Sequence, residues 1–177
     1  IEYAIKNNFD AAWLMDDDGY PDISSLEVLE NSFTEKSSCV SSIVVKENDI
    51  ESFVFPYPIL NKNDRPAIFA WPRKIKSKKE LLKRSKNFSY PFVHLFNGAL
   101  ISIEAVRKIG NINRNYFIYG DEIDYLYRLL KVGDVISNLN AIHYHPDVTN
   151  RPYSHLKIYF YLKNTLIINR TYLDNIF

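Results

Sequence analysis

The chain has 177 residues, 46% of them hydrophobic, and a formal net charge of +1 from 22 Lys and Arg against 21 Asp and Glu. The length and the hydrophobic content predict one folded domain over residues 1–177. The near-neutral charge excludes a strong electrostatic field that would recruit nucleic acid. The single cysteine, Cys39, excludes an internal disulfide framework, and no apolar run reaches the roughly 20 residues of a membrane span. We therefore expect a cytoplasmic protein.

The first predicted elements lead into an acidic turn. Apolar residues recur at helical spacing over residues 1–10, and a short apolar strand follows and ends at Met15. Residues 16–18 are all Asp, and Gly19 and Pro21 then turn the chain outward. The apolar run predicts a buried strand of a mostly parallel sheet. The carboxyl end of such a strand points into the ligand crevice, so the acids predict a divalent-cation site there. The alternative is an acidic, solvated turn.

The middle of the chain predicts a helix, a strand and a basic segment. Asp22 is a predicted N-cap for a helix over 23–33, and the β-branched residues at 39–45 predict a strand. Residues 52–70 contain three prolines and predict a loop with short extended pieces. The basic run at 74–86 predicts an exposed helix or loop, which is either a solvated face or a contact for an anionic acceptor or a membrane surface.

The last part of the chain alternates strand-like and helical patterns, which predicts an α/β fold. In order, the patterns predict a strand over 92–102 interrupted at Asn97 and Gly98, a helix over 103–109, an aromatic strand-like run at 116–119, a helix over 121–132, a strand over 135–144 and a helix over 152–169.

Three separated groups of residues have side chains suited to chemistry. They are the acidic triplet, the pair Asp121 and Glu122, and the pair His143 and His145, each next to a strand-like run. Two carboxylate clusters and a histidine can divide the work between a metal and a general base. Taken singly, each has a structural alternative, such as acids that charge a helix N-terminus. That helix terminus is expected to keep Glu122 ionised.

With these motifs the chain resembles the family-2 glycosyltransferases of the GT-A fold, particularly members that transfer galactofuranose or rhamnose. Residues 14–18 resemble the DXD strand end of that family, and residues 117–125 resemble its "ED" motif with the two acids in reversed order. Residues 141–146 resemble the segment that ends in a metal-binding histidine, best matched by His145. Residues 161–164 resemble the Tyr-x-Arg-Asn of the following helix, with Lys163 in place of Arg.

The resemblance implies a partial GT-A (Rossmann-like) domain with a mixed sheet flanked by helices, and an inverting, metal-dependent sugar transfer. The donor would be a UDP- or dTDP-linked sugar, and the acceptor a hydroxyl of a glycan or lipid-linked molecule at the inner face of the plasma membrane. A nucleoside-binding half is expected before Ile1. The implied roles are Glu122 as the base with Asp121 beside it; Asp16, Asp18 and His145 as ligands of Mn²⁺ or Mg²⁺; Asp17 in cofactor binding; and Trp71, Asn97, Gly98, Tyr119 and Asp124 in substrate binding.

Two other readings remain open. A haloacid-dehalogenase-like phosphatase would use Asp16 and Asp18 as nucleophile and acid, with Asp121 and Asp124 as distal Mg²⁺ ligands. Against it, Tyr20 stands where that family has a small residue. An inactive sugar-binding remnant is the second. A Ca²⁺-binding loop that begins at Asp16 is excluded, because Tyr20 stands at its fifth position, which needs an oxygen ligand, and Pro21 at its sixth, which needs glycine.

Overall fold

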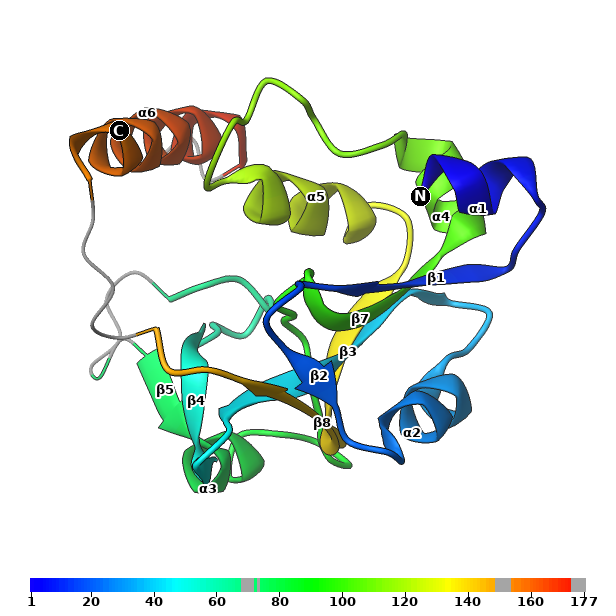
Figure 1. Cartoon of the computed structure of the whole chain (residues 1–177), viewed down its shortest axis with the longest axis vertical. Helices are drawn as coiled ribbons and strands as arrows, with labels where there is room; N and C mark the ends of the chain where they lie inside the picture. Colours follow the sequence, from blue (N-terminus) through cyan, green and yellow to red (C-terminus); the bar gives the residue numbers. More distant parts are fainter. Residues whose placement is uncertain (68–71, 73, 149–153, 173–177) are drawn as a thin grey trace.

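The sheet is organised around β3 (Ser37–Lys46), in which every residue except the last is buried. β8 (Asp134–His145) runs parallel along one side of β3. On the other side, β7 (Asn97–Ser102) pairs antiparallel with the first part of β3, and β4 (Asp49–Pro58) pairs antiparallel with its end. The computed structural model describes residues 1–67, 72, 74–148 and 154–172 (Figure 1).

Four further strands complete an eight-stranded mixed sheet. β1 (Ala11–Met15) lies at the edge beyond β7, and β5 (Lys74–Ser77) lies beyond β4. The short strands β2 (Tyr20–Pro21) and β6 (Ser89–Tyr90) pair with β8. The predicted α/β class with a mixed sheet flanked by helices is therefore confirmed.

Helices cover both faces of the sheet. α1 (Glu2–Lys6), α4 (Ile103–Ile109) and α5 (Asp121–Leu129) lie on one face and α2 (Ser25–Ser32) on the other, while α6 (His155–Tyr172) packs beside α5 and α3 (Lys78–Leu82) beside β4 and β5 (Figure 1). Because neighbouring strand residues point to opposite faces, Cys39 packs toward α4 and α5 and Val40 toward α2. None of the described helices is long and apolar enough to span a bilayer.

The expectation of a mostly parallel sheet is wrong. Among the described strands, β3 and β8 form the parallel pair, and β1 runs antiparallel to β7. Met15 at the end of β1 therefore lies opposite Asn97 at the start of β7. β1 is also only half-buried, because it is an edge strand.

The predicted loop at 52–70 is also wrong over its first part, where β4 continues to Pro58. Phe53 and Tyr57 of this strand are core residues, and their burial favours the extended backbone. Proline is tolerated because the ladder between β4 and β5 is interrupted between Ser52 and Tyr57, the stretch that contains Pro56.

Several predicted elements have different ends. α2 begins at Ser25, because Asp22 accepts hydrogen bonds from the backbone and side chain of Ser24 and so forms the preceding turn. The strand predicted at 92–102 begins only at Asn97. Residues 116–119 have irregular backbone rather than forming a strand, and the positive φ of Tyr119 (61°) interrupts an extended path there.

Further differences concern the chain's start, the basic run, α5 and α6, which ends at Tyr172 rather than at 169. α1 ends at Lys6, and the basic run forms β5 and α3, with Ile75 and Leu81 buried. α5 ends at Leu129, three residues before the predicted end at Val132. α4 has its predicted bounds, and Gly110 ends it with a φ of 79°.

Candidate metal and acid–base site

Asp16, Asp18 and His145 form a candidate metal site at the ends of β1 and β8. One ligand atom from each of the three lies within 4.8 Å of the others. The pairing of β2 with the end of β8 folds the acidic turn back onto that strand, which brings Asp18 Oδ1 to 3.0 Å from His145 Nε2. Two carboxylates and an imidazole are donors that a divalent cation accepts.

The imidazole of His145 is oriented for this role. Its Nδ1 lies 2.7 Å from the carbonyl oxygen of Pro146, which can only accept, so Nδ1 carries a proton and donates it. The lone pair of Nε2 is then directed at Asp18, and a proton or a cation between the two atoms makes their close approach favourable. The donor set therefore fits a divalent ion, as the sequence predicts.

His143 lies beneath this cluster and does not join it. His145, rather than His143, lies with Asp16 and Asp18. A Cβ atom at Gly19 would overlap His143 Nε2, and one at Gly98 would lie 3.1 Å from Nδ1. Burial lowers the pKa of His143 to about 4, so its ring is neutral and fills the space that the two glycines leave.

Asp16 connects the metal cluster to a cavity of about 540 Å³. Asn97 Nδ2 donates to Asp16 Oδ2 at 3.4 Å. Burial and then the charge of Asp18 raise the pKa of Asp16, because both disfavour its ionised form. A bound cation would offset this electrostatic cost of the carboxylate. The other residues that line this cavity are Phe55, Pro56, Lys74, His94, Phe96, Asn97, Ile118, Tyr119, Asp121, Glu122 and Tyr161.

Asp121 and Glu122 reach the same cavity from the start of α5. Burial, then the negative charges of Asp121 and Asp16, raise the pKa of Glu122 to about 7. The expectation that the helix terminus keeps Glu122 ionised is thus corrected, because burial in this cavity wall outweighs the helix dipole. A carboxyl group that titrates near neutrality is well matched to proton transfer.

Asn164 of α6 holds the turn that presents these acids. Its Nδ2 donates to the carbonyl oxygens of Ile118 at 2.9 Å and Tyr119 at 2.7 Å. Gly120 follows with a φ of 91°, and a Cβ atom there would lie 2.9 Å from Ile168 Cδ1 and 3.0 Å from Asn164 Cβ. The turn therefore requires glycine for both its backbone conformation and its packing.

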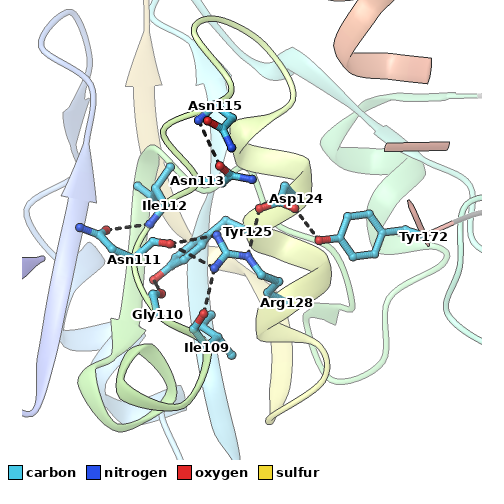
Figure 2. A network of polar contacts seen from close by, with 10 residues as sticks. All are labelled: Ile109, Gly110, Asn111, Ile112, Asn113, Asn115, Asp124, Tyr125, Arg128 and Tyr172. Carbon is cyan, nitrogen blue, oxygen red and sulfur yellow. Dashed lines mark hydrogen bonds and ion pairs between the residues drawn. The ribbon is translucent and has the colours of Figure 1, made fainter. Parts of the chain in front are cut away.

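Asp124 does not reach the cavity, contrary to its predicted role in substrate binding. Figure 2 shows both of its carboxylate oxygens in use: Tyr172 Oη donates to Oδ1 at 2.5 Å, and Arg128 Nε donates to Oδ2 at 3.0 Å. Arg128 also donates to the carbonyl oxygens of Ile109 and Asn111 after α4. Asp124 is 5% exposed and ties α5 to α6 and to the loop after α4.

Some of the other predicted site residues line the cavity and others do not. Asn97 and Tyr119 line the cavity, whereas Asp17 is exposed and outside the three-residue cluster. Gly98 is buried against His143 and Ser42, and Trp71 lies outside the described residues.

The sequence prediction missed several residues that line the cavity, including Lys74 and His94. His94 packs against the rings of Phe55, Tyr57 and Phe92, and burial lowers its pKa to about 4. Within the described part of the chain, its buried ring Nε2 has no hydrogen-bond partner. No spacing with another histidine or acid could have indicated this position.

No protein-family model and no curated protein matches this chain. The function is therefore inferred from the geometry of the site.

We predict that Mn²⁺ binds the wild-type protein and that Asp18→Ala weakens this binding at least about tenfold, because one of three ligands is lost. Isothermal titration calorimetry with Mn²⁺ alone measures the affinity. Asp17→Ala is the matched control, since it removes the same charge one residue away from an exposed position. Equal Mn²⁺ affinity in wild type and Asp18→Ala would disprove the metal assignment.

Proposed function

We propose that this chain is the metal-binding, acceptor-side portion of an inverting glycosyltransferase of the family-2, GT-A type. It would transfer a sugar from a UDP- or dTDP-linked donor to a hydroxyl of a glycan or lipid-linked acceptor. The observation that supports this most is that Glu122, with a pKa near 7, and Asp16, a candidate metal ligand, line one cavity.

In the proposed reaction, Glu122 accepts the proton of the acceptor hydroxyl as that oxygen bonds to the anomeric carbon. The bond from this carbon to the diphosphate breaks, and the diphosphate leaves with the bonding electron pair. A divalent cation bound by Asp16, Asp18 and His145 would neutralise charge on the diphosphate. Asn97 holds Asp16 in place through its hydrogen bond, and Lys74 adds a positive charge to the same cavity.

The composition of the site supports Mn²⁺ or Mg²⁺, because carboxylate oxygens make up two of the three donors. Aromatic rings support a sugar substrate: Tyr119 and Tyr161 meet edge to face with centroids 6.0 Å apart, and both line the cavity. The lysines and arginines of β5, α3 and the residues that follow support a location at the inner, anionic face of the plasma membrane.

The phosphatase alternative has less support. It would need Asp124 beside Asp121 as a distal Mg²⁺ ligand, but both oxygens of Asp124 are bound by Arg128 and Tyr172.

The proposal is tested in a protein that joins this chain to the nucleoside-binding half expected before Ile1, incubated with UDP- and dTDP-sugars, Mn²⁺ and a set of glycan and lipid-linked acceptors. We expect release of nucleoside diphosphate, a product of inverted anomeric configuration, and loss of both on addition of EDTA. Nucleotide-sugar binding without turnover would instead indicate a sugar-binding protein. Hydrolysis of p-nitrophenyl phosphate that survives Glu122→Gln but is lost in Asp16→Asn would indicate a phosphatase.

A further inference from the structure

A second cavity, of about 490 Å³, lies between the loop after β4, the residues after α3 and β6. Three of its lining residues, Lys83, Arg84 and Lys86, are cations, and one, Asp64, is an acid. This cavity shares no described lining residue with the cavity that leads to the candidate metal ligands. It is therefore a separate site, and its charge is opposite to that of the acidic one.

The three cations of this cavity have no ion-pair partner within the described part of the chain. Asp64 offsets one of their charges, so the lining carries a net charge of +2. Like charges that face one cavity repel one another, and a bound anion removes this repulsion.

Asn61 adds an uncharged donor to the same lining. Its Oδ1 accepts hydrogen bonds from the backbone N–H groups of Asn63 at 2.8 Å and Arg65 at 3.2 Å. These two bonds assign the other amide atom as Nδ2, which donates to no described atom of the protein. The charged and amide donors thus all suit a ligand rich in acceptor oxygens.

Two walls of the cavity are held in place by hydrogen bonds. Lys86 and Ser89 exchange backbone hydrogen bonds of 3.0 and 2.9 Å and so close a tight hairpin. Next to it, Tyr90 Oη donates to the carbonyl oxygen of Pro58 at 2.7 Å, which ties β6 to the end of β4. Because these walls are already ordered, binding there has a smaller entropy cost.

We propose that this cavity binds a phosphate monoester through Lys83, Arg84 and Lys86, with Asn61 Nδ2 donating to a phosphate oxygen. A phosphate monoester carries about −1.5 to −2 charges at pH 7, which matches the net charge of the lining, whereas a carboxylate or a phosphate diester carries less. The planar guanidinium of Arg84 can donate to two phosphate oxygens at once. This inference does not rest on the proposed sugar transfer.

The phosphate monoester is either a soluble molecule or the headgroup of a lipid. Leu82 and Phe88 belong to the two segments that supply the cations, and they are 47% and 51% exposed. Apolar side chains next to cations would contact the acyl region of a lipid whose headgroup occupies the cavity. The two sources therefore differ in whether Phe88 contributes to binding.

Isothermal titration calorimetry with sn-glycerol 3-phosphate, without donor or metal, tests for the site. We expect one molecule to bind per chain and no binding of glycerol. Arg84→Gln should weaken the binding at least about tenfold, because it removes charge-assisted hydrogen bonds. Lys79→Gln is the matched control and should keep the wild-type affinity, since Lys79 is an exposed cation of α3 outside the cavity lining.

Vesicle sedimentation distinguishes the two sources. Phosphatidylcholine vesicles contain either phosphatidic acid, a monoester, or phosphatidylglycerol, a diester, at equal surface charge. A lipid ligand predicts preference for phosphatidic acid that Arg84→Gln abolishes and Phe88→Asn weakens. Asparagine suits the φ of 60° at Phe88, so this variant should still bind glycerol 3-phosphate normally. Binding of glycerol 3-phosphate without the vesicle preference indicates a soluble ligand.

Two results would overturn the inference. One is an equal loss of binding in Arg84→Gln and Lys79→Gln, because diffuse attraction to the basic surface does not depend on the cavity. The other is no binding of glycerol 3-phosphate together with equal binding to both kinds of vesicle. Neither result bears on sugar transfer, because the two sites have no lining residue in common among those described.

Discussion

Replacement of Glu122 with Gln, in a protein that includes the expected nucleoside-binding half, should lower kcat for sugar transfer by ~10²–10⁴ and leave the Kd values for nucleotide sugar and Mn²⁺ nearly unchanged. Glutamine keeps the size and much of the polarity of the side chain but cannot accept the acceptor's proton. Steady-state kinetics with separate binding measurements give the two quantities. Asp121→Asn should have a smaller effect, because Asp121 acts mainly through its charge on Glu122.

The dependence of the rate on pH provides the control for this prediction. Because the pKa of Glu122 is about 7, the wild-type rate should fall as the pH drops below about 7 and the base takes up a proton. The rate that remains in Glu122→Gln should lack this inflection. If Asp121→Asn abolishes turnover and Glu122→Gln does not, Asp121 is the base.

The same raised pKa predicts how the substitution affects stability. The folded-state pKa of Glu122, about 7, lies above the ordinary value of 4.5. Proton binding by Glu122 therefore contributes stability that is fully present below pH 4.5 and is lost as the pH rises through about 7. At pH 8 the neutral Glu122→Gln variant should therefore melt no lower than the wild type. Loss of activity then cannot be ascribed to unfolding.

Replacement of Arg128 with Met is expected to lower the free energy of unfolding by ~3–5 kcal/mol. The substitution keeps an apolar stem but leaves the carboxylate of Asp124 buried and without its cation. It also removes the hydrogen bonds to the carbonyl oxygens of Ile109 and Asn111 (Figure 2). Urea unfolding at pH 7 measures the change.

An ion pair on α4 has the same spacing of four residues as Asp124 and Arg128 and serves as the control. Lys108 Nζ is 2.6 Å from Glu104 Oε1, but both side chains are more than half exposed. Lys108→Met should therefore change the free energy of unfolding far less than Arg128→Met, because water screens both charges. Similar losses in the two variants would show that burial of Asp124 does not determine the effect.

The sequence predicts local features of the site well. The acids that follow β1, the acids that open α5 and the histidine that ends β8 are each marked by the end of an apolar or aromatic run next to polar residues. It does not predict which strands pair, because the register of β1 against β7 depends on residues distant in the chain. The raised pKa of Glu122 was missed for a similar reason, since its burial is a tertiary property.

For Asp124, the sequence itself contains evidence against the predicted role in substrate binding. Arg128 stands four residues after it, a spacing at which helical side chains meet, and this spacing favours an ion pair over substrate binding. The contact with Tyr172 could not be predicted in the same way, because it depends on how α6 packs beside α5. No sequence pattern around His94 indicates that this residue lines the cavity.

The three candidate metal ligands lie at the ends of strands that are far apart in the sequence. Asp16 and Asp18 follow β1, and His145 ends β8, with most of the chain between them. During synthesis the two acids leave the ribosome long before the imidazole, and the parallel pairing of β8 with β3 closes a long loop, which makes it a slow folding step. A cation that requires all three ligands binds only after β8 has docked, and by mass action it favours the completed sheet. The cellular supply of that cation would then influence how much of the newly made protein reaches its native state.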